Sequence, residues 1–193
     1  MNDLALNPAT TALLLMDLQA GILESHSGAE ALLPGLLRAR EAARQAGFTV
    51  GYVRVALTPE DAAKALTTPG SFAAAAASGR LDDASPATQI DARILPAGGE
   101  IVVRKSRVGA FGTTDLDDQL RARGIDTLVL AGISTSGVVL STVRDASDCD
   151  YRIVVLADGC FDRDEEVHRV LTQKVFTRQA TVVSIDEFVA AIG

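Results

Sequence analysis

Three features of the 193-residue sequence predict an α/β fold, a three-layer α/β/α arrangement around a six-stranded, mostly parallel, doubly wound sheet. Short apolar runs alternate along the chain with segments whose apolar residues recur at helical spacing. The apolar runs are continuous, which is typical of strands that helices cover on both faces. The chain is long enough for one substantial core, so we expect a single domain over residues 1–193.

The predicted elements follow one another in order. A buried strand (12–16, ALLLM) precedes a helix (30–47) that stops at Gly47, and a second strand follows (48–55, FTVGYVRV). Residues 56–100 hold four of the six prolines and the low-complexity run FAAAAASG, so we expect an irregular excursion with one or two short helices. After it come predicted strands at 100–105, 126–132, 151–158 and 180–184, and predicted helices at 114–124, after residue 132, at 164–176 and in the terminal IDEFVAAIG.

Composition limits the partners and the location. Eighteen Lys and Arg against 25 Asp and Glu give a net charge of -7, which disfavours nucleic-acid binding and favours a small-molecule substrate. Cys149 and Cys160 fall in no metal-like spacing, so we expect no structural zinc site, and the sequence predicts no metal ion or other cofactor. The N-terminus has no basic segment, and its apolar run TALLLM is too short to span a bilayer. We therefore expect a cytoplasmic protein without a membrane partner.

Polar residues directly follow several predicted strands, at the sheet edge where ligands bind in doubly wound folds. Asp17 and Lys105 abut apolar strands, where a carboxylate and an ammonium are costly unless they meet each other or a ligand. We therefore expect these two side chains to face each other. The same rule selects Gln19, Arg54, residues 134–138 and residues 158–160.

Three motifs carry a resemblance: LLLMDLQ, VVRKSRVGAFGTTDL and LVLAGISTSGVVLSTVRDA. Together they resemble the isochorismatase-like (cysteine hydrolase) superfamily over nearly the whole chain apart from residues 56–100. The resemblance implies a six-stranded parallel sheet and a catalytic trio of Asp, Lys and Cys. The first two match Asp17 and Lys105, whereas the third position is Val138, which has no nucleophile. A covalent thioester mechanism is therefore excluded at this position.

The resemblance also implies a cis peptide bond between Ile133 and Ser134, with the N–H groups of Ser134 and Val138 forming an oxyanion hole. A simpler interpretation is that the hydroxyl residues 134–136 only cap a helix. Thr135 and Ser136 are conceivable nucleophiles, but no His lies near them in the sequence. Cys160 ends a predicted strand on the same side of the sheet, and a buried structural role is favoured for it over catalysis.

Several other residues have both a functional and a structural interpretation. As substrate-binding residues, Gln19 could orient Asp17 or the substrate, Phe111 resembles a residue that borders the pocket in this family, and Arg54 matches a position that holds substrate carboxylates in some relatives. Alternatively, Gln19 has a surface role, Phe111 belongs to the core, and Arg54 is a solvated arginine. Of the two histidines, His26 lies on a loop that could reach the pocket mouth, and His168 is expected on a helix surface.

Two functional hypotheses follow. The first is a hydrolase without a covalent cysteine intermediate, in which Asp17 acts with Lys105 as general acid or base on a small enol-ether or acyl or amide compound. The role of Asp17 stays open, because Lys105 lowers its pKa while burial raises it. The second is a non-catalytic binding or assembly protein. The resemblance further implies a homo-oligomer. A pocket in which the two charges meet beside the Ser134 turn would favour catalysis.

Overall fold

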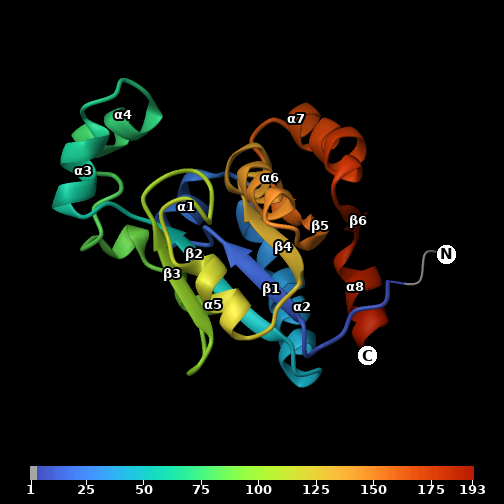
Figure 1. Ribbon diagram of the computed structural model, residues 1–193. Helices are drawn as coiled ribbons and strands as arrows, with labels where there is room; N and C mark the ends of the chain where they lie inside the picture. Colours follow the sequence, from blue (N-terminus) through green and yellow to red (C-terminus); the bar gives the residue numbers. More distant parts are fainter. Residues whose placement is uncertain (1–3) are drawn as a thin grey trace.

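The computed structural model describes residues 4–193 and has a six-stranded sheet at its centre (Figure 1). The strand order is β3-β2-β1-β4-β5-β6, and all five neighbouring pairs are parallel. This confirms the predicted doubly wound sheet. The strands are β1 (Thr11–Met16), β2 (Thr49–Val55), β3 (Ile101–Lys105), β4 (Thr127–Ile133), β5 (Arg152–Phe161) and β6 (Thr181–Val183).

Helices cover both faces of this sheet. Alternate residues of β1 point to opposite faces, so Leu13 and Leu15 join one apolar core while Leu14 and Met16 join the other. All six β1 residues are buried as a result, which explains the continuous apolar run in the sequence. The face of Leu13 is covered by α2 (Leu33–Gln45) and α8 (Ile185–Ile192), and the other by α5 (Leu116–Ala122), α6 (Leu140–Asp148) and α7 (Glu165–Val170) with the turns that follow it.

The excursion between β2 and β3 contains two short helices, as the sequence predicts. They are α3 (Pro59–Ala65) and α4 (Ser71–Ala77), which stand away from the sheet in Figure 1. Single turns of 3-10 helix lie at Ala29–Leu32, Pro86–Thr88, Ala92–Ile94 and Phe176–Arg178. In the part of the chain that the structure describes, no helix is both long enough and apolar enough to cross a membrane.

Three local features differ from the prediction. Helix α1 (Ala20–Ser25) was not expected, because six residues are too few to show a helical period. Strand β5 runs to Phe161 rather than 158, because the β4–β5 register shifts between Leu130 and Gly132 and pairing then resumes. The helix after β4 begins as a π-helical turn (Thr135–Val139) that continues into α6, and a second π turn (Leu171–Val175) follows α7.

Candidate active site

The strand order places Asp17 and Ser134 side by side. β1 and β4 are neighbours at the centre of the sheet, where the strand order reverses and where ligands bind in this kind of fold. Asp17 directly follows β1, and Ser134 directly follows β4. Asp17 has a left-handed φ of 56°, and its N–H donates to the carbonyl oxygen of Val53 (2.8 Å). The chain therefore turns sharply at Asp17.

Lys105, at the end of β3, forms an ion pair with Asp17. Its Nζ lies 2.8 Å from Asp17 Oδ2, although β2 separates the two strands. Nζ also donates to the carbonyl oxygens of Val108 (2.8 Å) and Arg107 (3.2 Å). An ammonium has three N–H donors, so these three partners use all of them. The side chains expected to face each other do so, and Lys105 has no donor left over for a ligand.

The carboxyl group of Asp17 is only half satisfied. Its side chain is 7% exposed, and burial raises its pKa to about 6, although the neighbouring ammonium of Lys105 acts in the opposite direction. Oδ2 contacts Lys105, whereas Oδ1 has no hydrogen-bond partner among residues 4–193. A buried oxygen without a partner is uncommon and is a ready acceptor for a donor group of a ligand or water.

Both charged residues line a cavity of about 210 Å³. Its other polar lining residues are His26 and Ser134, and Val138 also lines it with a side chain that is almost fully buried. The peptide bond between Ile133 and Ser134 is cis, as the resemblance implies. Ser134 precedes the π turn and α6, so the positive end of this helix points towards the cavity. The sequence motifs therefore meet in one place.

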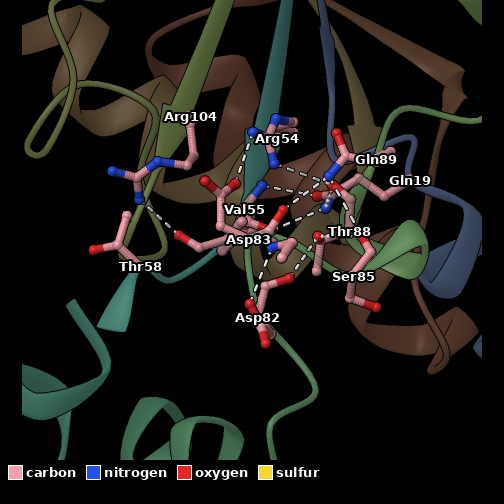
Figure 2. A network of polar contacts seen from close by, with 12 residues as sticks. Gln19, Arg54, Val55, Thr58, Asp82, Asp83, Ser85, Thr88, Gln89 and Arg104 are labelled. Atoms are coloured by element: carbon pink, nitrogen blue, oxygen red, sulfur yellow. Dashed lines mark hydrogen bonds and ion pairs between the residues drawn. The ribbon is translucent and has the colours of Figure 1, made fainter. Parts of the chain in front are cut away.

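Gln19 and Arg54 do not line this cavity. The Gln19 amide donates to the carbonyl oxygens of Val55 (2.9 Å) and Thr88 (2.6 Å), and it accepts the Val55 N–H (2.8 Å), as Figure 2 shows. Arg54 pairs with Asp83 at 2.8 Å in the same network (Figure 2). Both residues hold the excursion against the ends of β1 and β2 instead of pointing at the substrate space.

Phe111 also lies elsewhere. It packs against the core on the α5 and α6 side, with its ring centroid 5.9 Å from that of Tyr151. Of the three residues expected to bind substrate, none is among the cavity-lining residues. The lining residues that the sequence did not reveal are hydrocarbon side chains: Ile22, Val55, Phe72, Leu81 and Val108.

The two cysteines are outside the cavity as well. Cys160 pairs with Gly132 inside the sheet, and burial raises the pKa of its thiol to about 12, so almost no thiolate forms at neutral pH. Burial also raises the pKa of Cys149. Among residues 4–193, no three His, Cys, Asp or Glu side chains are grouped so that they could hold a metal ion.

The hydroxyl of Thr135 has a histidine partner that the sequence did not suggest. Its Oγ1 lies 2.9 Å from Nδ1 of His168, which α7 brings to the start of the π turn. Thr135 is, however, fully buried and does not line the cavity. The contact therefore anchors α7 against the turn, and Thr135 is inaccessible as a nucleophile.

Comparison with known proteins agrees with this geometry. The family model described as the isochorismatase domain matches residues 11–187. Isochorismatase family protein YecD of Escherichia coli O157:H7 is 36% identical to this chain, covering 98% of it and 100% of the relative. Ureidoacrylate amidohydrolase RutB of Methylobacterium radiotolerans is 33% identical and covers 98% of this chain and 82% of its own.

A solved structure shows the same fold. The cysteine hydrolase from Pseudomonas syringae pv. phaseolicola 1448A superposes with a TM-score of 0.85 at 22% identity, over 97% of this chain and 94% of that one. The match of the family model over most of the chain, together with the full-length similarity to YecD, decides the family. This chain belongs to the isochorismatase-like hydrolase family.

Proposed function

We propose that this protein is a hydrolase in which Asp17 activates water for direct attack on a small acyl compound, an ester or an amide, without a covalent cysteine intermediate. The observation that carries the proposal is the half-satisfied carboxyl group: Lys105 holds Oδ2, and Oδ1 is left without a partner in a residue that lines the cavity. The similarity to a protein named as an amidohydrolase supports an acyl substrate.

Asp17 acts as a general base in this mechanism. With a pKa of about 6, roughly ten carboxylates are present for each carboxylic acid at pH 7. Oδ1 accepts a proton from water as the water oxygen attacks the carbonyl carbon. When the tetrahedral intermediate collapses, the same proton passes from Oδ1 to the departing alcohol or amine. The cycle then ends with a carboxylic acid product and ionised Asp17.

The oxyanion must be stabilised by donors other than Lys105, because the three N–H groups of Lys105 are already engaged. We assign this role to the backbone N–H groups of Ser134 and Val138, at the positive end of the helix beside the cavity. Lys105 then acts by keeping Asp17 ionised and fixed.

Val138 is consistent with this mechanism. Its side chain lines the cavity, and the motif resemblance matches it to the nucleophile of the cysteine members, while the chain's two cysteines lie elsewhere. Because no side chain there attacks the substrate, the acyl group is transferred directly to water. The non-catalytic alternative is less well supported, because a site kept only for binding has no need for a buried charge pair with a free carboxylate oxygen.

The raised pKa of Asp17 favours one second candidate, in which the protonated carboxyl group acts as a general acid on an enol ether. Protonation of the enol-ether carbon would produce an oxocarbenium-like species that water traps. The two roles predict opposite pH dependence, since the acid is lost and the base is gained as the pH rises through about 6.

The test is a hydrolysis assay with a panel of small esters, amides, lactones and isochorismate. Wild type is compared with Asp17→Asn and with Asp61→Asn, a control in which the altered carboxylate pairs with Arg104 and does not line the cavity. We expect Asp17→Asn to lower kcat/KM about 10² to 10⁴-fold and Asp61→Asn to leave it within a few-fold of wild type. Hydrolysis that survives Asp17→Asn at full rate would exclude this mechanism.

Assembly into a homo-oligomer and a cytoplasmic location stay predictions. Light scattering tests the homo-oligomer.

A further inference from the structure

Much of the cavity lining consists of hydrocarbon side chains. These side chains come from five separate segments: α1, the end of β2, α4, the loop after α4 and the loop after β3. They are Ile22, Val55, Phe72, Leu81 and Val108. Among residues 4–193, the Asp, Glu, Lys and Arg side chains that line the cavity are Asp17 and Lys105, which form one ion pair.

The cations near the cavity are already engaged. All three donors of Lys105 are occupied, and Arg54 pairs with Asp83. Arg107 donates to the carbonyl oxygen of Ser106 (2.6 Å), and its guanidinium lies 5.6 Å from the ring centroid of Phe72. Arg107 and Phe72 line a neighbouring cavity together, whereas only Phe72 also lines the active-site cavity.

A substrate with a carboxylate would therefore lose water on entry without gaining an unpaired Lys or Arg side chain among the described cavity-lining residues. It would also be repelled by ionised Asp17, whose free Oδ1 belongs to a cavity-lining residue. A hydrocarbon group at the same place loses little and gains contact with the apolar wall. The ion-paired charges and the apolar lining of the cavity thus disfavour the binding of anionic compounds.

We propose that the cavity selects uncharged acyl compounds with a short hydrocarbon acyl group, and that Phe72 sets the limit on acyl length. An apolar cavity of about 150 Å³ holds benzene, so the 210 Å³ cavity has room for about eight non-hydrogen atoms. Phe72 is the largest lining side chain and belongs to α4 in the excursion. The substrate class rests on the proposed function, since it concerns the same site.

Two inert ketones of equal size test the charge preference without any catalysis. The uncharged 5-methylhexan-2-one and the anion levulinate differ only in that a carboxylate replaces an isopropyl group. Binding of each to the wild-type protein is measured by ligand-observed NMR at pH 7.5. We expect the uncharged ketone to bind at least tenfold more tightly. Equal or tighter binding of levulinate would overturn the proposal.

Longer ketones test the role of Phe72. In wild type we expect nonan-2-one to bind more weakly than 5-methylhexan-2-one. In Phe72→Ala we expect the ratio of the two affinities to shift about tenfold towards the longer ketone, and in Phe72→Leu we expect a smaller shift. Phe111→Leu is the matched control, because this phenylalanine packs against Tyr151 outside the cavity. An unchanged length preference in both Phe72 variants would refute its role.

The binding experiments and the hydrolysis assay test the ligand preference and the proposed function separately. If the ketones bind as expected but 4-methylpentanamide and methyl 3-methylbutanoate are not hydrolysed, the proposed function is wrong and the ligand preference stands. If small anionic esters are hydrolysed in a manner that depends on Asp17 and uncharged ones are not, the function stands and the ligand preference is wrong.

Discussion

Replacing Lys105 by Met should destabilise the protein in a strongly pH-dependent way. In wild type, Asp17 has a pKa of about 6 after folding, against 3.8 for a solvent-exposed aspartate in the unfolded chain. A carboxyl group whose pKa is raised by folding contributes stability below the unfolded-state value, and this contribution is lost as the pH rises through 6. Above pH 6 the wild-type contribution no longer changes, because Asp17 is ionised in both states.

Lys105→Met removes the ammonium that holds the pKa of Asp17 down, so only the effect of burial is left. The folded variant must then keep Asp17 protonated to a higher pH, while the unfolded chain ionises as before. Each pH unit between 6 and the new pKa costs the variant about 1.4 kcal/mol relative to wild type. If the new pKa is near 8, the extra loss between pH 6 and pH 8 is about 2.7 kcal/mol.

The assay is urea denaturation of wild type and Lys105→Met at several pH values from 5.5 to 8, with the difference in unfolding free energy plotted against pH. Arg104→Met is the matched control. Arg104 precedes Lys105 in β3 and pairs with Asp61 at 2.6 Å, but this pair is partly exposed and should contribute about 1 kcal/mol or less, with no pH trend in this range. A Lys105→Met difference that is constant between pH 6 and pH 8 would mean that Lys105 does not hold down the pKa of Asp17.

Three further predictions concern the surroundings of the site. Gly132→Ala should lower the free energy of unfolding, measured by heat or urea, by about 3 kcal/mol or more, because the new Cβ would lie 2.2 Å from the carbonyl oxygen of Met16. Gly98→Ala, where a new Cβ meets nothing within 4 Å, should lower it far less. Val138→Cys should place a thiol in the cavity that iodoacetamide alkylates faster than Cys160, as peptide mass mapping would show; equal rates would contradict the placement. Cys160→Ala should leave kcat/KM within a few-fold of wild type, and a loss of 100-fold would give this thiol a role that its position does not explain.

The sequence predicted the sheet because its signal is local. β1 and β4 are buried along their whole length, so their apolar runs stand out without knowledge of their neighbours. The pairing of Asp17 with Lys105 was also predictable, because two charges at the ends of buried strands need each other. Helix α1 was missed because it is short and its N-cap residue, Gln19, makes no side-chain cap.

The cavity wall was not predictable for a different reason. The expectation that ligands bind where the parallel strands end selects residues at the correct edge of the sheet, but it does not say where each side chain points. Gln19 and Arg54 are at that edge and bond to the excursion instead of lining the cavity. Phe72 and Leu81 line it although their segment has no periodic pattern, because tertiary packing alone decides where the excursion returns.

The pH dependence of kcat/KM for the best ester or amide of the panel shows directly whether Asp17 is the base that activates water. We expect kcat/KM to rise with pH through a midpoint near 6 and to become nearly level above pH 7 in wild type, since most of Asp17 is then in its base form. A rate that falls through the same midpoint would assign Asp17 the acid role, and a profile without a transition near 6 would contradict its part in the reaction.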